Sequence, residues 1–151
     1  MFQPVKDWFA QKKWKPFPYQ QKAWNAFRDG KSGLIHVPTG SGKTYAATMG
    51  PIASMLENQK KGLKLLYLTP LRAVSRDIEQ ALILPIESQG WPLKVESRTG
   101  DTSGSHKQKQ LKNPPDILIT TPESLSVLLS RKGSGTFFSN LQCVVVDEWH
   151  E

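Results

Sequence analysis

Hydrophobic patterning alternates between two periods along the chain, and it predicts buried strands and helices in turn. Short continuous apolar runs predict strands at residues 33–37, 63–68, 93–98, 116–120 and 144–148. Helical spacing and boundary residues predict helices at residues 5–14, 19–28, 43–57, 106–112 and 122–129, with another that starts at Leu71 and that Pro85 should end or kink. Because continuous apolar strands that alternate with helices are typical of a parallel sheet covered on both faces, we expect an α/β fold.

The polar loops follow the predicted strands. The sequences PTGSGKT, TPLR, RTGD, TPES and DEWH each come directly after one of the apolar runs. In open parallel sheets, ligands bind at the carboxyl ends of the strands. We therefore expect these loops to gather at one edge of the sheet and to form the functional site there.

Composition narrows the class of protein. The chain has 151 residues, enough for one domain with a core, and its formal net charge is +7. A hydrophobic content of 38% excludes a disordered chain, and no apolar run approaches the roughly 20 residues of a membrane span. The N-terminus does not have the pattern of a secretory signal, and the single cysteine, Cys143, cannot form an internal disulfide. These features predict a reduced, cytoplasmic protein without a membrane segment, and the basic charge is compatible with a polyanionic partner.

Residues 38–44 have the sequence of a phosphate-binding loop. Glycines allow the tight turn that points backbone N–H groups at phosphates, and the helix that follows directs its positive end at the same place. The Lys43 ammonium would reach the β- and γ-phosphates, and the Thr44 hydroxyl would ligate Mg²⁺. The expected phosphate-binding residues are Thr39, Gly40, Ser41, Gly42, Lys43 and Thr44. The alternative is a glycine-rich turn that merely precedes a helix.

An acidic pair follows the last apolar run. Asp147 at the tip of a buried strand beside a phosphate-binding loop is placed to hold Mg²⁺, and Glu148 to orient and deprotonate an attacking water. The alternative is a solvated acidic strand end. The presence of both motifs in one predicted sheet favours an ATP site, with Lys43, Asp147 and Glu148 as its catalytic residues.

Together these motifs resemble superfamily 2 DExH-box helicases. PTGSGKT is similar to motif I, DEWH to motif II, FPYQ at residues 17–20 to a Q-motif, TPLRA to motif Ia and TPESL to motif Ib. Further details, HVPTGSGKT, RTGDTS and VVVDEWHE, resemble the Lhr (large helicase-related) group, and within it the bacterial ligase-associated DEXH-box DNA helicases. The resemblance implies a RecA-like P-loop NTPase domain with ATP and Mg²⁺ as cofactors. It also implies an ATP-dependent helicase or translocase that acts on nucleic acid, with DNA in repair as the expected setting.

The resemblance also assigns roles to single residues. Gln20 would read the adenine, Thr44 and Asp147 would hold the metal, and His150 would couple the nucleotide site to the strand site. The residues implied to contact the sugar-phosphate backbone are Pro70, Arg72, Thr99, Gly100, Thr121 and Pro122. The lysines at residues 107, 109 and 112 are expected by default to form a solvated face.

The resemblance divides the chain at residue 33. Residues 1–32 would form N-terminal helices with the Q-motif, and residues 33–151 part of a first RecA-like domain, from motif I to motif II. Motif III, whose strand would lie between the P-loop strand and the DExH strand, and the second RecA-like domain have no counterpart here. We therefore expect loose packing around residues 144–146. A second hypothesis, a non-catalytic module that binds ATP and nucleic acid, stays open for the 151 residues alone.

Overall fold

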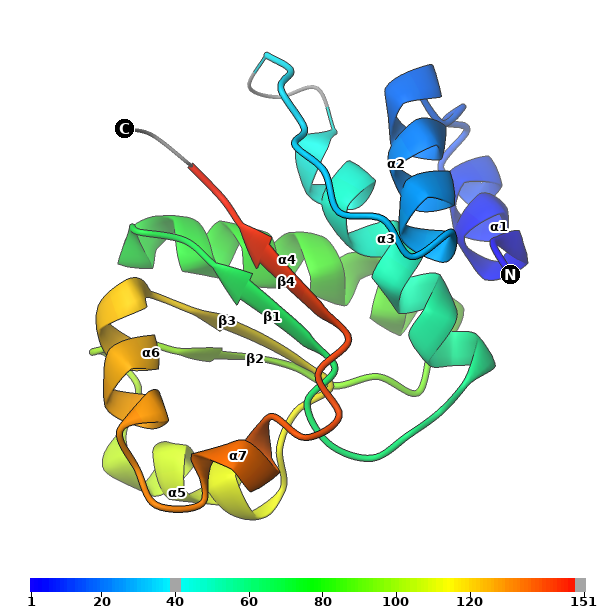
Figure 1. The fold of residues 1–151 in the computed structure, drawn as a ribbon. Coiled ribbons are helices and arrows are strands. Elements are labelled where there is room, and N and C mark those ends of the chain that lie inside the picture. The colour runs from blue at the N-terminus through cyan, green and yellow to red at the C-terminus, as the bar shows by residue number, and fades with distance from the viewer. Residues whose placement is uncertain (39–41, 149–151) are drawn as a thin grey trace.

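The structure is a computed structural model that describes residues 1–38 and 42–148, and it contains one parallel sheet between helices (Figure 1). Its elements are α1 (Gln3–Gln11), α2 (Pro18–Arg28), α3 (Lys43–Glu57), β1 (Leu65–Leu68), α4 (Arg72–Gln89), β2 (Val95–Arg98), α5 (Gly104–Lys112), β3 (Ile117–Thr120), α6 (Pro122–Leu129), α7 (Ser134–Phe137) and β4 (Cys143–Val146). Within the described residues, no helix combines the length and the apolar character needed to cross a bilayer.

The sheet has the strand order β2-β3-β1-β4, and every neighbouring pair is parallel. Alternate residues of the strands face opposite ways, so that Leu65 and Tyr67 pack into one core with α1–α4. Leu66 and Leu118 pack into a second core with α6 and α7. Figure 1 shows α5, α6 and α7 on one side of the strands and α4 on the other. This confirms the predicted α/β class with both faces covered.

The N-terminal helices pack onto α3 through an aromatic cluster. The Trp8 ring meets those of Phe9 and Tyr45 edge-on, at centroid distances of 5.6 and 5.1 Å. The Trp24 side chain is 1% exposed, and its indole N–H donates to the Tyr45 carbonyl at 2.9 Å. Edge-to-face pairs of this kind stabilise a core beyond the area that they bury. The cluster fixes α1 and α2 against the first half of α3, where the phosphate-binding loop ends.

The sequence predicts that Pro85 ends or kinks the helix that starts at Leu71. The predicted end is wrong, because α4 continues to Gln89 with Pro85 inside it. Proline has no N–H, so the carbonyl four residues earlier, at Ala81, loses its helical partner. The Tyr45 hydroxyl of α3 donates to this carbonyl at 2.9 Å. A contact between helices therefore satisfies the group that the proline leaves without a donor, and the helix persists.

The predicted strand at residues 33–37 is also wrong, because the structure has no strand there. A strand needs a neighbouring ladder for its backbone groups, and among the described residues β4 pairs with β1 alone. The Leu34 side chain is 81% exposed, and Val144 and Val146 on β4 are about half exposed. The apolar run at residues 33–37 carries the composition of a buried strand without the neighbours that would bury it.

Candidate functional site

The loops that the sequence singles out do lie at the carboxyl ends of the strands. Arg72 follows β1, Gly100 follows β2, Thr121 follows β3 and Asp147 follows β4. Lys43, the first residue of α3, faces the same edge, because its ammonium lies 3.6 Å from an Asp147 carboxylate oxygen. The residues form two groups, one around Lys43 and Asp147 and one in a groove beside Arg72.

The ion pair between Lys43 and Asp147 joins the helix start to the strand end. The backbone N–H of Asp147 donates to the Leu68 carbonyl at 2.8 Å, which extends the β1–β4 pairing by one residue. The Asp147 side chain is only 11% exposed, so its charge is screened by water less than that of a surface carboxylate. Two motifs that are far apart in the sequence thus place opposite charges side by side in the structure.

Glycine suits position 42, where a residue with a side chain would be strained. Its φ of +79° is in the left-handed region, and a Cβ there would lie 2.5 Å from the Gln20 amide nitrogen. That nitrogen donates to the Gly42 carbonyl at 3.0 Å, while the Gln20 amide oxygen accepts from the Phe17 N–H at 2.9 Å. Gln20 therefore ties the start of α2 to the start of α3. Each end of its amide keeps further hydrogen-bonding capacity for an adenine edge.

Tyr67 on β1 is a member of this group that the sequence reasoning missed. Its hydroxyl donates to Asp147 Oδ2 at 2.9 Å. Desolvation by burial, followed by the charge of Asp147, raises the pKa of Tyr67 far above its ordinary value, so the phenol stays protonated. The available signal was a single hydroxyl in the otherwise aliphatic strand LLYL, two residues before the TP turn.

Glu148 has an uncommon backbone conformation. Its φ is +56°, which is rare for a residue with a side chain, and its backbone N–H donates to Asp147 Oδ1 at 2.9 Å. The side chain is exposed at the end of β4. Sparsely populated backbone conformations cost on the order of 1 kcal/mol and cluster at functional sites. The turn separates the directions of the two acidic side chains immediately after the strand.

The donors in this group fit Mg²⁺. The Asp147 carboxylate lies 3.6 Å from the ammonium of Lys43, and Thr44 follows Lys43 in the first turn of α3, so both oxygen-bearing side chains belong to the same edge. Mg²⁺ takes oxygen ligands and is usually held by one or two protein groups, with waters and phosphates completing the shell.

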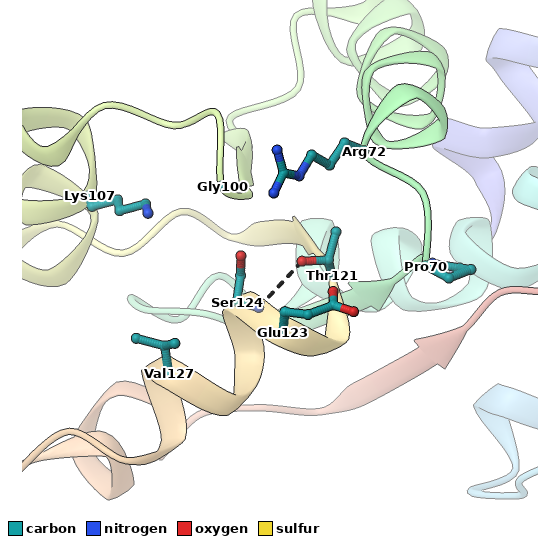
Figure 2. A pocket seen from close by; sticks show the side chains of 8 residues that line it. All are labelled: Pro70, Arg72, Gly100, Lys107, Thr121, Glu123, Ser124 and Val127. Atoms are coloured by element: carbon teal, nitrogen blue, oxygen red, sulfur yellow. Dashed lines mark hydrogen bonds between the residues drawn. The ribbon is translucent and has the colours of Figure 1, made fainter.

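A second group of residues lines an open groove of about 500 Å³ (Figure 2). The lining residues are Pro70, Arg72, Gly100, Lys107, Thr121, Glu123, Ser124 and Val127. Four of the six predicted backbone-contact residues are among them. The other two, Thr99 and Pro122, are not: Thr99 is 5% exposed and its hydroxyl accepts the Asp101 N–H, while Pro122 is the first residue of α6.

Cations face the groove from two sides. Figure 2 shows Arg72 reaching in from α4 and Lys107 from α5, above Ser124 of α6. The Arg72 guanidinium lies against Gly100, where a Cβ would come within 2.5 Å of it, and pairs with the Asp101 carboxylate at 3.2 Å. Sequence reasoning treated Lys107 as one of several solvated lysines. The helical spacing of residues 107, 109 and 112 does not reveal which lysine turns toward the groove.

The remaining predicted residues lie outside the part of the chain that the structure describes. These are Thr39, Gly40 and Ser41 of the phosphate-binding loop, and His150 after the acidic pair. Their assignments stay predictions.

Comparisons with known proteins agree with this geometry. A family model described as DEAD/DEAH box helicase matches residues 17–151. The ATP-dependent helicase Lhr-Core of Methanocaldococcus jannaschii is 40% identical over 97% of this chain, which covers 19% of that protein. A structure described as Mycobacterium smegmatis helicase Lhr bound to ssDNA and AMP-PNP has a TM-score of 0.84 and 35% identity, over 97% of this chain and 20% of that one.

A third comparison extends the fold to a different helicase. The structure described as DUF1998 helicase MrfA bound to DNA and AMPPNP has a TM-score of 0.85 and 26% identity, over 95% of this chain and 20% of that one. This chain therefore spans about a fifth of the length of each of these three proteins. The predicted superfamily is confirmed, since the family match covers most of the sequence: the chain belongs to the DEAD/DEAH box helicase family.

Proposed function

We propose that this chain is the N-terminal ATP-binding part of an ATP-dependent helicase or translocase that moves along DNA. The single observation that supports this best is the 3.6 Å approach of the Lys43 ammonium to the Asp147 carboxylate, at the edge where α3 begins and β4 ends. A cation, a helix N-terminus and two carboxylates gathered at one sheet edge suit a nucleoside triphosphate and its metal. Residues 33–151 would form the partial RecA-like domain, and residues 1–32 its Q-motif extension.

The chemistry follows from what each side chain can do. The Lys43 ammonium and the N-terminal N–H groups of α3 would take the negative charge of the phosphates. Thr44 and Asp147 would hold Mg²⁺, which when bound neutralises the charge that develops on the phosphate oxygens. Glu148 would orient a water toward the γ-phosphate and accept its proton. Gln20 would contact the adenine through the amide capacity that its bonds to Phe17 and Gly42 leave free.

The groove beside Arg72 would hold the sugar-phosphate backbone of one strand. Its cations and hydroxyls suit phosphates and contain nothing shaped to read bases, so binding should be largely independent of sequence and sensitive to salt. DNA is favoured because two similar structures are described as bound to ssDNA or DNA. A role in DNA repair, together with repair-protein partners, is proposed from the resemblance to ligase-associated helicases.

The groove makes a prediction about salt. Replacing Lys107 with Ala is expected to weaken ssDNA binding several-fold and to lower the slope of log affinity against log salt by about one, because one phosphate contact is lost. Lys109→Ala is the matched control, since it removes the same charge from an exposed position on the same helix that does not line the groove. Fluorescence anisotropy with a labelled oligonucleotide at several salt concentrations measures both the affinity for ssDNA and its dependence on salt.

The control decides how that result is interpreted. If Lys107→Ala and Lys109→Ala weaken binding equally, only the net charge matters and the groove is not the strand site. If Arg72→Ala also binds ssDNA like the unaltered protein, the proposed strand site is wrong altogether.

A second function is favoured by the one-sided charge of the nucleotide site. In the described part of the chain, Lys43 is the only cation within ion-pair distance of Asp147. A triphosphate held from one side would bind but would be hydrolysed slowly, because little charge is stabilised at the bond that breaks. The 151 residues alone would then act as a non-catalytic module for ATP and nucleic acid. An ATPase assay of the chain with and without ssDNA separates the two functions.

A further inference from the structure

Tyr67 contacts one of the groups that are expected to hold the metal. It is the third residue of β1 and 1% exposed, with its ring in the core that α3 also lines. Its hydroxyl lies at the edge of that core, 2.9 Å from Asp147 Oδ2. The phenolic oxygen therefore joins the middle of the sheet to the end of β4.

The direction of this bond follows from donor chemistry. A carboxylate oxygen can only accept, so the single hydroxyl hydrogen of Tyr67 goes to Asp147 Oδ2. The bond leaves the other lone pairs of the carboxylate free, and lone pairs are what a metal ligand must offer.

The same bond, together with two other contacts, orients the Asp147 carboxylate. Tyr67 occupies Oδ2, while Oδ1 receives the Glu148 N–H at 2.9 Å and faces the Lys43 ammonium at 3.6 Å. The carboxylate is held at both oxygens, so its rotation is fixed before any ligand binds. Groups that fix metal ligands from behind commonly change metal affinity by about 10- to 100-fold when they are removed.

We propose that Tyr67 is a positioning residue for Mg²⁺, which sets the orientation of the Asp147 carboxylate and so determines how tightly the metal–nucleotide complex binds. This rests on the proposed nucleotide site. Tyr67 would touch neither the nucleotide nor the metal. It acts through Asp147, and its effect should therefore appear in the dependence on Mg²⁺ rather than in nucleotide binding without metal.

The test compares two tyrosine variants. Tyr67→Phe keeps the buried ring and removes only the hydroxyl that donates to Asp147. Tyr45→Phe is the matched control, since it removes a tyrosine hydroxyl from a partly buried ring packed against the same core, one that donates to the Ala81 carbonyl away from the site. Affinity for a non-hydrolysable ATP analogue is measured by isothermal titration calorimetry over a series of Mg²⁺ concentrations and in EDTA, with thermal melting as the check on folding.

We expect Tyr67→Phe to need about 10-fold more Mg²⁺ for half of the metal-dependent gain in affinity, with the affinity in EDTA unchanged. Tyr45→Phe should keep the Mg²⁺ midpoint of the unaltered protein.

Three results would overturn the proposal. An unchanged Mg²⁺ midpoint in Tyr67→Phe would remove the positioning role, and so would an equal loss of affinity with and without Mg²⁺, which marks a structural role. If the unaltered chain binds the analogue with no Mg²⁺ dependence at all, the proposed nucleotide site itself fails, and the role of Tyr67 fails with it.

Discussion

A protein carrying Glu148→Gln is expected to bind ATP and a DNA strand normally but to hydrolyse ATP about 10²- to 10⁴-fold more slowly, the range attributed to a positioned general base. Glutamine has the size of glutamate, and its amide cannot take the proton of the attacking water. The Lys43 ammonium faces the Asp147 carboxylate at 3.6 Å, and the substitution leaves both groups in place, so phosphate binding should survive. The measurement is ssDNA-stimulated ATP turnover in the full-length protein, beside nucleotide affinity.

The matched control for this prediction is Glu57→Gln. Glu57 is the last residue of α3, at the end of the helix away from Lys43, and the substitution removes the same charge. It should leave turnover within about two-fold of the unaltered protein. Turnover by Glu148→Gln that equals turnover by Glu57→Gln would contradict the assignment of Glu148 as the base.

Replacing Lys43 with Ala is expected to weaken ATP binding strongly and to lower turnover by about 10²- to 10³-fold, as when one preorganised charge-stabilising group is removed. Two effects act together. The phosphates lose the ammonium, and the Asp147 carboxylate, now without its cation at 3.6 Å, repels the same phosphates. The loss in affinity should be larger for the triphosphate than for the monophosphate, because the ammonium lies where the terminal phosphates would be.

Lys22→Ala is a suitable comparison for that experiment, because Lys22 is an exposed lysine on α2. Calorimetric titration of ATP and AMP against the three proteins separates a local effect from a change in net charge. Equal affinities for ATP in Lys43→Ala and Lys22→Ala would show that Lys43 does not contact the phosphates.

Much of this fold is predictable from the sequence because continuous apolar runs are a strong signal for buried parallel strands. β1 and β3 lie inside the runs predicted at residues 63–68 and 116–120, β4 overlaps the run predicted at 144–148 and begins one residue earlier, and the polar loops after them meet at one edge. The run at residues 33–37 has the same composition and yet forms no strand. Composition reports the tendency to be buried, whereas a strand also requires a partner, and the pattern within one segment contains no information about its partner.

The residues of the site divide in the same way, into those that the local sequence reveals and those that it does not. Lys43 and Asp147 are identifiable because a phosphate-binding loop and an acidic strand end have recognisable local sequences, and each sits in a predicted strand-loop setting. Tyr67 and Lys107 are not, since their importance comes from what lies beside them after folding. The error at Pro85 has a similar cause, because the Tyr45 hydroxyl that satisfies the Ala81 carbonyl is far away in the sequence.

The account depends on a triphosphate and its metal lying between the start of α3 and the end of β4. A crystal structure of the chain with a non-hydrolysable ATP analogue and Mg²⁺ tests this directly. The account predicts the terminal phosphate against the Lys43 ammonium and the metal between the Thr44 hydroxyl and the Asp147 carboxylate. An analogue bound elsewhere, or a metal that neither Thr44 nor Asp147 approaches directly or through water, would contradict it.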